Sequence, residues 1–380
     1  MIIQPRHEQF PLERDMLYFN HAAVSPWPVC TAEAIKDFTK QNLLSGSKNY
    51  LQWLELEKQL RELMNWLING DSPDDIALLK NTSEGLSVIA YGLDFKSEDN
   101  IVIPKDEFPS NRIVWESLSP RGIETRQIDI VNTSDPEQAL IDSMDAKTRL
   151  LSVSAVQYSS GLRLDLEKLG RYCRENNVLF AVDAIQQLGA LAFDQKKIQA
   201  DFIVADGHKW MMGPEGLALF YCRPEIRAKL NLNQYGWHMV DNPSDFNQSQ
   251  WRIVDTAQRF ECGSPNMLAC HALHASLNLI KKTGIENIES SILSNTKKIR
   301  RYVNNSKHYS LNSHADETRL SGITNFKHNS LSNAYLHETL TSQGVQCAQR
   351  GDGVRLAPHF YHEQWEFDRL FEILDAIQST

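Results

Sequence analysis

The sequence predicts an α/β protein: a three-layer αβα large domain with a mostly parallel sheet, plus a smaller α+β C-terminal domain. Three observations predict this fold. Short apolar runs alternate with helix-like stretches, as in sheets covered by helices on both faces. Polar clusters follow several of these runs, at the strand ends where such sheets bind ligands. From about residue 306 a smaller segment follows, and it closes with a helix predicted over 363–377.

The pattern begins in the first quarter of the chain. Residues 1–30 are rich in proline and other turn-forming residues, so we expect an extended N-terminal arm. Apolar residues recur at helical spacing from Leu51 to Ile68, which predicts an amphipathic helix. The apolar run Ile76–Leu79, the polar turn 81–85 and the helix-like stretch Leu86–Leu93 then form the first strand–turn–helix unit.

The same unit recurs later in the chain. Another helix is predicted at Leu164–Glu175, residues 225–262 read as an irregular connection, and residues 265–305 read as helical. Further strands are predicted at Ile101–Ile103, Leu150–Val156, Val178–Val182, Asp201–Ala205 and Leu217–Cys222.

We therefore expect three parts: an arm at 1–30, a large domain at 31–264, and connecting helices with the small domain at 265–380. A chain of 380 residues with 42% hydrophobic content can bury cores of this number and size.

Composition limits the function classes. The net charge of -9 gives no electrostatic reason to bind nucleic acid or an anionic membrane. No run approaches the roughly 20 apolar residues that a membrane-spanning helix needs, and the N-terminus lacks the features of a signal peptide. The six cysteines include no Cys-x-x-Cys pair, so we expect neither a metal centre nor a disulfide scaffold. A reducing, cytoplasmic location is expected.

Lys209 is the central chemical feature of the sequence. It follows a predicted strand, and the flanking segments Phe202–Ala205 and Trp210–Met212 are apolar, so Lys209 is expected to be buried. A buried lysine without a partner is costly. A lysine whose pKa is lowered by its surroundings can form an imine with an aldehyde cofactor. We therefore expect a covalent or ionic partner for Lys209.

Two other polar clusters lie at predicted strand ends. Asp183 could support a protonated ring nitrogen, with Gln186 three residues later facing the same site, or it could simply cap a helix. In the turn 81–85, Thr82 and Ser83 begin a helix and are candidates for holding a phosphate. A capping box without a ligand is the alternative for this turn.

Taken together, these features resemble the class V aminotransferase and cysteine desulfurase-like family of pyridoxal-phosphate (PLP) enzymes, of fold type I. The resemblance spans most of the chain. It rests on seven segments in the family's order: Tyr18–Ala23, Asn81–Gly85, Glu107–Asn111, Asp183–Gln186, Asp206–Lys209, Glu261–Asn266 and Val354–Tyr361.

The resemblance implies how the cofactor is held. PLP is expected as a Schiff base on Lys209, the catalytic residue. Asp183 is expected at the ring nitrogen and Gln186 at the ring hydroxyl. Phe108 takes the place of the residue that stacks on the ring.

The resemblance also implies a phosphate site and a homodimer with shared active sites. Thr82, Ser83 and His208 are expected at the phosphate. Ser264 matches the hydroxyl residue that the family brings to the phosphate of the partner subunit.

The substrate is expected to be a small amino acid. Arg355 matches the arginine that clamps its carboxylate, because the planar guanidinium makes a two-pronged contact. Asn20, His21 and Ala22 belong to the segment that opens the family's active site, so we expect them near the substrate.

Two positions depart from the family pattern. Asp206 stands where many relatives have a hydroxyl residue, and a carboxylate there would repel a phosphate, so we expect it to face His208 or Lys209 instead. The desulfurases carry a catalytic cysteine on a loop before the carboxylate arginine. Here Cys347 lies in a predicted strand, and we expect a buried, unreactive thiol.

The sequence therefore predicts a PLP-dependent enzyme similar to class V aminotransferases. Activity like that of a cysteine desulfurase or selenocysteine lyase, or of an amino-acid epimerase, stays open, because the sequence does not determine which bond breaks. A nucleotide-dependent oxidoreductase would need Gly-x-Gly-x-x-Gly after the first strand, which is absent. A non-catalytic relative would have lost Lys209, Asp183 or Arg355, and all three are present.

Overall fold

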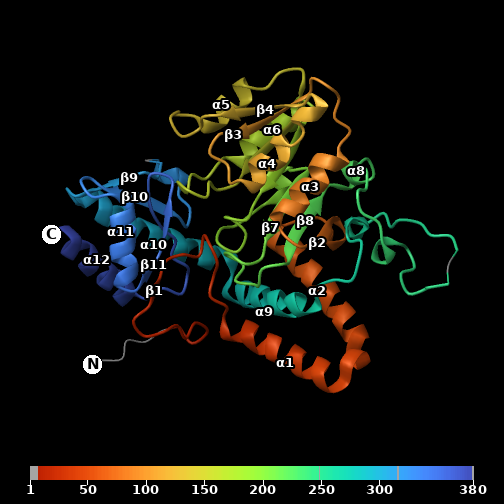
Figure 1. Cartoon of the computed structure of the whole chain (residues 1–380), viewed down its shortest axis with the longest axis horizontal. Coiled ribbons are helices and arrows are strands. Elements are labelled where there is room, and N and C mark those ends of the chain that lie inside the picture. Colours follow the sequence, from red (N-terminus) through yellow and green to blue (C-terminus); the bar gives the residue numbers. More distant parts are fainter. Residues whose placement is uncertain (1–6, 248, 315, 379–380) are drawn as a thin grey trace.

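The computed structural model of the protein describes residues 7–247, 249–314 and 316–378. Its centre is a seven-stranded sheet in the order β2-β8-β7-β6-β5-β3-β4 (Figure 1). Strand β8 is antiparallel to both of its neighbours, and the other neighbouring pairs are parallel, which confirms the predicted mostly parallel sheet. The strands are β2 (Ile76–Leu79), β3 (Asn100–Pro104), β4 (Glu124–Ile128), β5 (Thr148–Ser154), β6 (Leu179–Asp183), β7 (Phe202–Asp206) and β8 (Ala218–Cys222).

Helices surround this sheet and continue into the C-terminal part of the chain (Figure 1). They are α1 (Val29–Ser45), α2 (Tyr50–Ile68), α3 (Thr82–Gly92), α4 (Ser110–Glu116), α5 (Pro136–Asp142), α6 (Leu166–Glu175), α7 (Gln195–Ile198), α8 (Pro224–Arg227), α9 (Met267–Thr283), α10 (Ile285–Asn305), α11 (Asn333–Ser342) and α12 (Gln364–Gln378). None of the helices in the described ranges is both long and apolar enough to cross a membrane.

Side chains of the central strands alternate between two cores, because successive residues of a strand point to opposite faces. In β7, Ile203 and Ala205 join the core formed with α2, α6 and α9. Phe202 and Val204, on the other face, join the core formed with α3 and α4. The central sheet is therefore buried on both sides, as the apolar runs predicted.

A second sheet lies beside the central one (Figure 1). It is four-stranded and antiparallel, in the order β12-β13-β10-β9, and it packs against the second half of α10 and against α11 and α12. The N-terminal strand β1 (Leu17–Tyr18) pairs in parallel with β11 (Val345–Gln346), so the start of the chain is held by the C-terminal part. The other strands are β9 (Tyr309–Leu311), β10 (Thr324–His328), β12 (Ala348–Arg350) and β13 (Gly353–Leu356).

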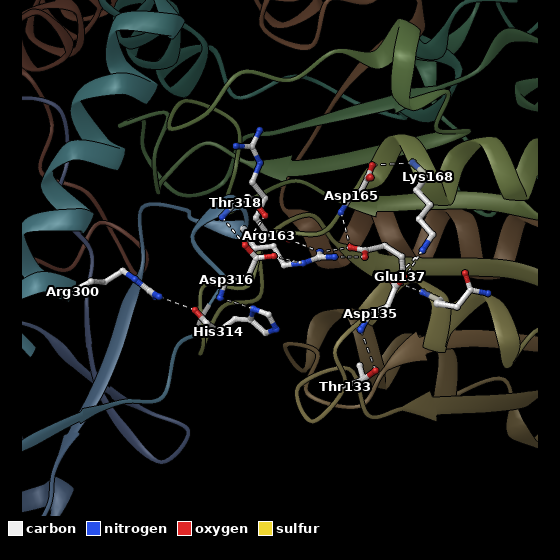
Figure 2. A network of polar contacts seen from close by, with 12 residues as sticks. Thr133, Asp135, Glu137, Arg163, Asp165, Lys168, Arg300, His314, Asp316 and Thr318 are labelled. Atoms are coloured by element: carbon white, nitrogen blue, oxygen red, sulfur yellow. Dashed lines mark hydrogen bonds and ion pairs between the residues drawn. The ribbon is translucent and has the colours of Figure 1, made fainter. Parts of the chain in front are cut away.

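Buried polar contacts join the C-terminal part to the central sheet. Arg319 donates to both carboxylate oxygens of Glu137, at 2.6 and 2.7 Å, and Glu137 also accepts from the Asp165 backbone N–H at 2.7 Å. In Figure 2 the segment that carries Asp316 and Thr318 lies beside this network. Because Glu137 is only 1% exposed, water does not compete strongly for the pair.

The structure differs from the predicted elements at several places. Helices α1, α4, α5 and α7 and strand β4 were not predicted; β4 is an edge strand with partly exposed side chains and no apolar run. The helical stretch 265–305 is two helices, separated at Gly284, whose φ of 87° ends α9. Residues 225–262 are irregular as predicted, and part of them extends away from the body of the molecule (Figure 1). The domain boundaries stay a prediction.

Candidate active site

A cavity of about 280 Å³ lies where the carboxyl ends of the central strands meet the C-terminal sheet. Its wall includes Asp183 at the end of β6 and Arg355 from β13. It also includes Ser110, Tyr158 and Arg350, which the sequence analysis did not predict. Of the predicted site residues, the structure brings together Ala22, Thr82, Ser83, Phe108, Asp183, Gln186, His208, Lys209 and Arg355.

Lys209 lies in a tight loop after β7. The Gly213 backbone N–H donates to the Gly207 carbonyl at 2.9 Å, and the left-handed Met212 (φ 57°) is held by Ser276, whose hydroxyl donates to the Met212 carbonyl. No described residue forms a hydrogen bond or an ion pair with Lys209 Nζ.

The surroundings of Lys209 favour its neutral form. Burial lowers its pKa to about 8; Asp183 opposes the shift, and the positive charge of Arg355 adds to it. At a pKa of about 8, roughly a tenth of the amine is uncharged at pH 7, and this is the form that can attack an aldehyde.

Asp183 is a buried carboxylate that accepts a hydrogen bond from the Ile185 backbone N–H at 3.0 Å. Burial raises its pKa to about 6, while the Ile185 hydrogen bond and Lys209 oppose the shift. A cationic ring nitrogen would stabilise its charged form. The side chain thus fits its predicted role.

Gln186 lies next to Asp183 and is held by two hydrogen bonds. Its Nε2 donates to the Ala22 carbonyl at 3.0 Å, and its Oε1 accepts from Trp210 Nε1 at 2.8 Å. A primary amide has two N–H donors. One donor therefore stays available for the predicted contact with a ring hydroxyl.

The first turn of α3 lies at the cavity wall. Asn81 caps the helix by accepting from the Glu84 backbone N–H at 2.9 Å, and Ser83 Oγ donates to Ser110 Oγ at 2.8 Å. The helix start is capped and also faces a cavity. The helix cap and the predicted phosphate site are therefore compatible at this turn. Asp206 Oδ1 lies 2.9 Å from His208 Nδ1, so the acid is directed at His208, as expected.

Phe108 and Arg355 both line the cavity. The Phe108 ring is 40% exposed, and its centroid lies 5.4 Å from Lys209 Nζ. Arg355 is 2% exposed, donates to the Tyr158 carbonyl at 2.7 Å, and has a buried Nε without a hydrogen-bond partner. Burial lowers the pKa of Arg355 to about 9, and Arg350 adds to this shift. An anion bound beside Arg355 would offset the lowering of its pKa by burial and by Arg350.

Three predicted residues do not line the cavity. His21 is buried behind it, with Nε2 2.6 Å from the Tyr361 hydroxyl and Nδ1 2.8 Å from the Ala357 carbonyl. Asn20 forms a β-bridge with Ala357. Ser264 is exposed, and its predicted role concerns a second copy of the chain.

Cys347 is buried, and burial raises its pKa to about 12. No cysteine of the described ranges lines the cavity. Its burial and raised pKa agree with the unreactive thiol that the sequence analysis expects.

The sequence analysis assigned no role to Glu107, a buried acid near Asp183. It accepts hydrogen bonds from the Ser154 backbone N–H (2.6 Å), Ser154 Oγ (2.5 Å) and Gln157 Nε2 (3.1 Å). Burial raises its pKa to about 7, and the charge of Asp183 adds to this shift. Only its place beside Phe108 in a recognised segment could have drawn attention to it.

Comparison with known proteins identifies the family. The family model for aminotransferase class-V matches residues 17–366. The chain belongs to this family. This class V protein is 29% identical to a probable cysteine desulfurase of Methanothermobacter thermautotrophicus over 390 residues, which cover 97% of the chain and 96% of the relative.

Two solved structures show the same fold as this class V protein. An apo cysteine desulfurase from Thermococcus onnurineus NA1 superposes with a TM-score of 0.87 at 21% identity, covering 99% of each chain. The cystine C–S lyase C-DES, in complex with its product cysteine persulfide, superposes with a TM-score of 0.88 at 23% identity, covering 96% of this chain and 99% of that one.

PLP is the cofactor of this family and of this chain. The cavity fits PLP, because it combines an unpartnered buried amine for the aldehyde with a buried carboxylate for the ring nitrogen. The individual contacts of PLP with Lys209, Asp183, Gln186, Phe108, Thr82, Ser83 and His208 are the assignments we propose.

Proposed function

We propose that this enzyme cleaves the C–S bond of a sulfur-containing amino acid by β-elimination, without a cysteine nucleophile of its own. The observation that carries the proposal is a cavity that offers Lys209 as an acid–base group but no thiol. The names of the relatives, a probable cysteine desulfurase and a C–S lyase, support chemistry at sulfur. C–S cleavage therefore replaces transamination as our first choice.

The residues of the cavity divide the work. Arg355 binds the α-carboxylate and orients the substrate. PLP, when bound, supplies an electron sink for negative charge at the α-carbon. Asp183 keeps its negative charge at the ring nitrogen, and Phe108 holds the plane of the ring. Lys209 Nζ, neutral in part because of its lowered pKa, takes the proton from the α-carbon.

The sulfur then leaves with the electron pair of its bond to the β-carbon. A desulfurase that transfers sulfur to its own cysteine needs a reactive thiol at this point, and the thiol of Cys347 is buried. Elimination needs none. Its products are a thiol or persulfide and, after reaction with water, pyruvate and ammonia.

The test is product analysis with the purified PLP-loaded enzyme and L-cystine, L-cysteine or S-alkyl cysteines. We expect pyruvate in equal amount with the sulfur product. Lys209→Ala should lose the visible absorbance band of the bound cofactor and lower the rate by about 10²–10⁴-fold. The control Cys347→Ser should keep the wild-type rate.

Alanine in place of pyruvate, together with inactivity of Cys347→Ser, would show transfer to a protein thiol and refute the proposal. Conversion of the cofactor to its amine form, with release of a keto acid that retains sulfur, would show transamination.

A further inference from the structure

Arg350 lines the active-site cavity together with Arg355, and it is the more exposed of the two arginines. The residues lie on adjacent antiparallel strands, where Ala348 pairs with Arg355 and Arg350 pairs with Gly353. The two guanidinium groups therefore approach the cavity from one sheet. The positive charge of Arg350 lowers the pKa of both Lys209 and Arg355, which indicates that it acts within the site.

The backbone at Arg350 is fixed although its side chain is exposed. Asn325 Nδ2 donates to the Arg350 carbonyl at 2.8 Å and to the Ser159 carbonyl at 3.0 Å. Gly351, with φ 53°, makes the tight turn that returns the chain from β12 to β13. The guanidinium group thus extends from an anchored position.

No acidic residue of the described ranges forms an ion pair with Arg350. Its Nη1 donates only to the carbonyl of the preceding Gln349, at 2.8 Å. The nearest acid in sequence, Asp352, pairs with Lys327 at 2.7 Å instead. Arginines that lie in a cavity without an anion are typical recognition groups for carboxylate or phosphate.

Arg350 is the charged group of the proposed site to which no partner has been assigned. In that proposal Arg355 receives the α-carboxylate, Lys209 the cofactor aldehyde and Asp183 the ring nitrogen. The cofactor phosphate is assigned to Thr82, Ser83 and His208, at the start of α3 and in the loop after β7. Asp206 already faces His208. A substrate with a single carboxylate would leave the positive charge of Arg350 uncompensated beside Arg355.

We propose that Arg350 is a second anion-binding residue, and that the preferred substrate carries a carboxylate or similar small anion at the far end of its side chain. The sulfur atom of this substrate rests on the proposed C–S cleavage. The two proposals together define the substrate class as cysteine whose sulfur is linked to an acidic group.

The experiment compares two ligands that differ at that position. S-carboxymethyl-L-cysteine and S-ethyl-L-cysteine are titrated into PLP-loaded wild type, Arg350→Gln and Arg350→Lys, and binding is followed by the change in cofactor absorbance. We expect Arg350→Gln to weaken the acidic ligand at least about tenfold and the ethyl ligand less than about twofold. Arg350→Lys should keep part of the preference, because it keeps the charge but loses the planar fork.

Arg149→Gln, a change at an exposed arginine on β5, is the matched control and should leave both affinities unchanged. Equal weakening of both ligands by Arg350→Gln would place Arg350 at the α-carboxylate and overturn the proposal. No weakening of either ligand would overturn it as well. Because binding is read from the initial absorbance change, before product forms, a selective loss would stand even if product analysis refuted C–S cleavage, and the reverse also holds.

Discussion

Glu107 and Asp183 are two buried carboxyl groups in one site, and only Asp183 has a counterpart in the proposed chemistry. Ser154, opposite Asp183 in the sheet, donates from both its N–H and its hydroxyl to Glu107. The negative charge of Asp183 adds to the raised pKa of Glu107. The pH dependence of Glu107 is therefore the property of this pair that can be tested.

We expect Glu107→Gln to change how stability depends on pH. The pKa of Glu107 is raised in the folded state to about 7 from 4.5, so its contribution to stability is full below pH 4.5 and is lost as pH rises through 7. Between pH 5 and pH 8 the wild type should therefore lose stability relative to the variant, on the order of 2 kcal/mol. Thermal unfolding at several pH values measures this difference.

The exposed Glu175→Gln is the control and should run parallel to the wild type across this pH range. A Glu107→Gln profile that is also parallel to the wild type would mean that Glu107 ionises as readily in the folded protein as in the unfolded chain, which would contradict the prediction.

Among the elements, α3 depends on a close approach to the central sheet. A Cβ at Gly85 would lie 2.4 Å from Val204 Cγ1 in β7. A methyl group there must push α3 away from β7 and displace the Thr82 and Ser83 end of the helix. Glycine is thus required at position 85 because a larger side chain would collide with β7. Its backbone conformation, which is helical, does not itself require glycine.

We expect Gly85→Ala to lower both stability and PLP affinity. Overpacking costs about 1–3 kcal/mol and is offset only in part by the higher helix propensity of alanine, worth about 1 kcal/mol. Thermal unfolding and equilibrium titration with PLP measure the two effects. Gly263→Ala, whose added methyl would meet no atom within 4 Å, is the control for stability. Unchanged PLP affinity in Gly85→Ala would show that the position of α3 does not contribute to binding of the phosphate.

The buried strands could be predicted because burial on both faces produces continuous apolar runs, as in β6 and β7. Strand β4 lies at the sheet edge and has no such run. Asp183 and Lys209 were recognisable because they follow strand ends. Arg350 was not recognisable from the sequence. Its place in the cavity depends on the pairing of β12 with β13, and no local sequence pattern shows that β12 lies beside the cavity.

At the scale of the whole molecule, the proposed substrate site is divided between two sheets. Lys209 follows a strand of the central sheet, whereas Arg355 belongs to the C-terminal sheet. The distance between the two groups depends on how the sheets are held together. The buried pair of Arg319 with Glu137 is one of those contacts.

We expect Arg319→Ala to destabilise the protein by about 3–5 kcal/mol, because it leaves the buried Glu137 carboxylate without its cation. The KM for the amino acid should rise more than the dissociation constant for PLP, since PLP is proposed to contact mainly the central-sheet side. Denaturant unfolding and steady-state kinetics measure these effects.

Lys327→Ala is the control, because it breaks a pair with the exposed Asp352 that solvent screens, so it should change stability much less than Arg319→Ala. A destabilised Arg319→Ala enzyme with an unchanged KM would show that the two sheets keep their spacing without this pair.

The pairing of β1 with β11 has a consequence for biosynthesis. Ala22, which lines the cavity, follows a segment that is anchored at Val345, Gln346 and Ala357. During translation this stretch must wait, unpaired, until nearly the whole polypeptide has left the ribosome. Stable capture of the vitamin-derived coenzyme should accordingly be one of the last events in maturation, and nascent chains released early should fail to retain it.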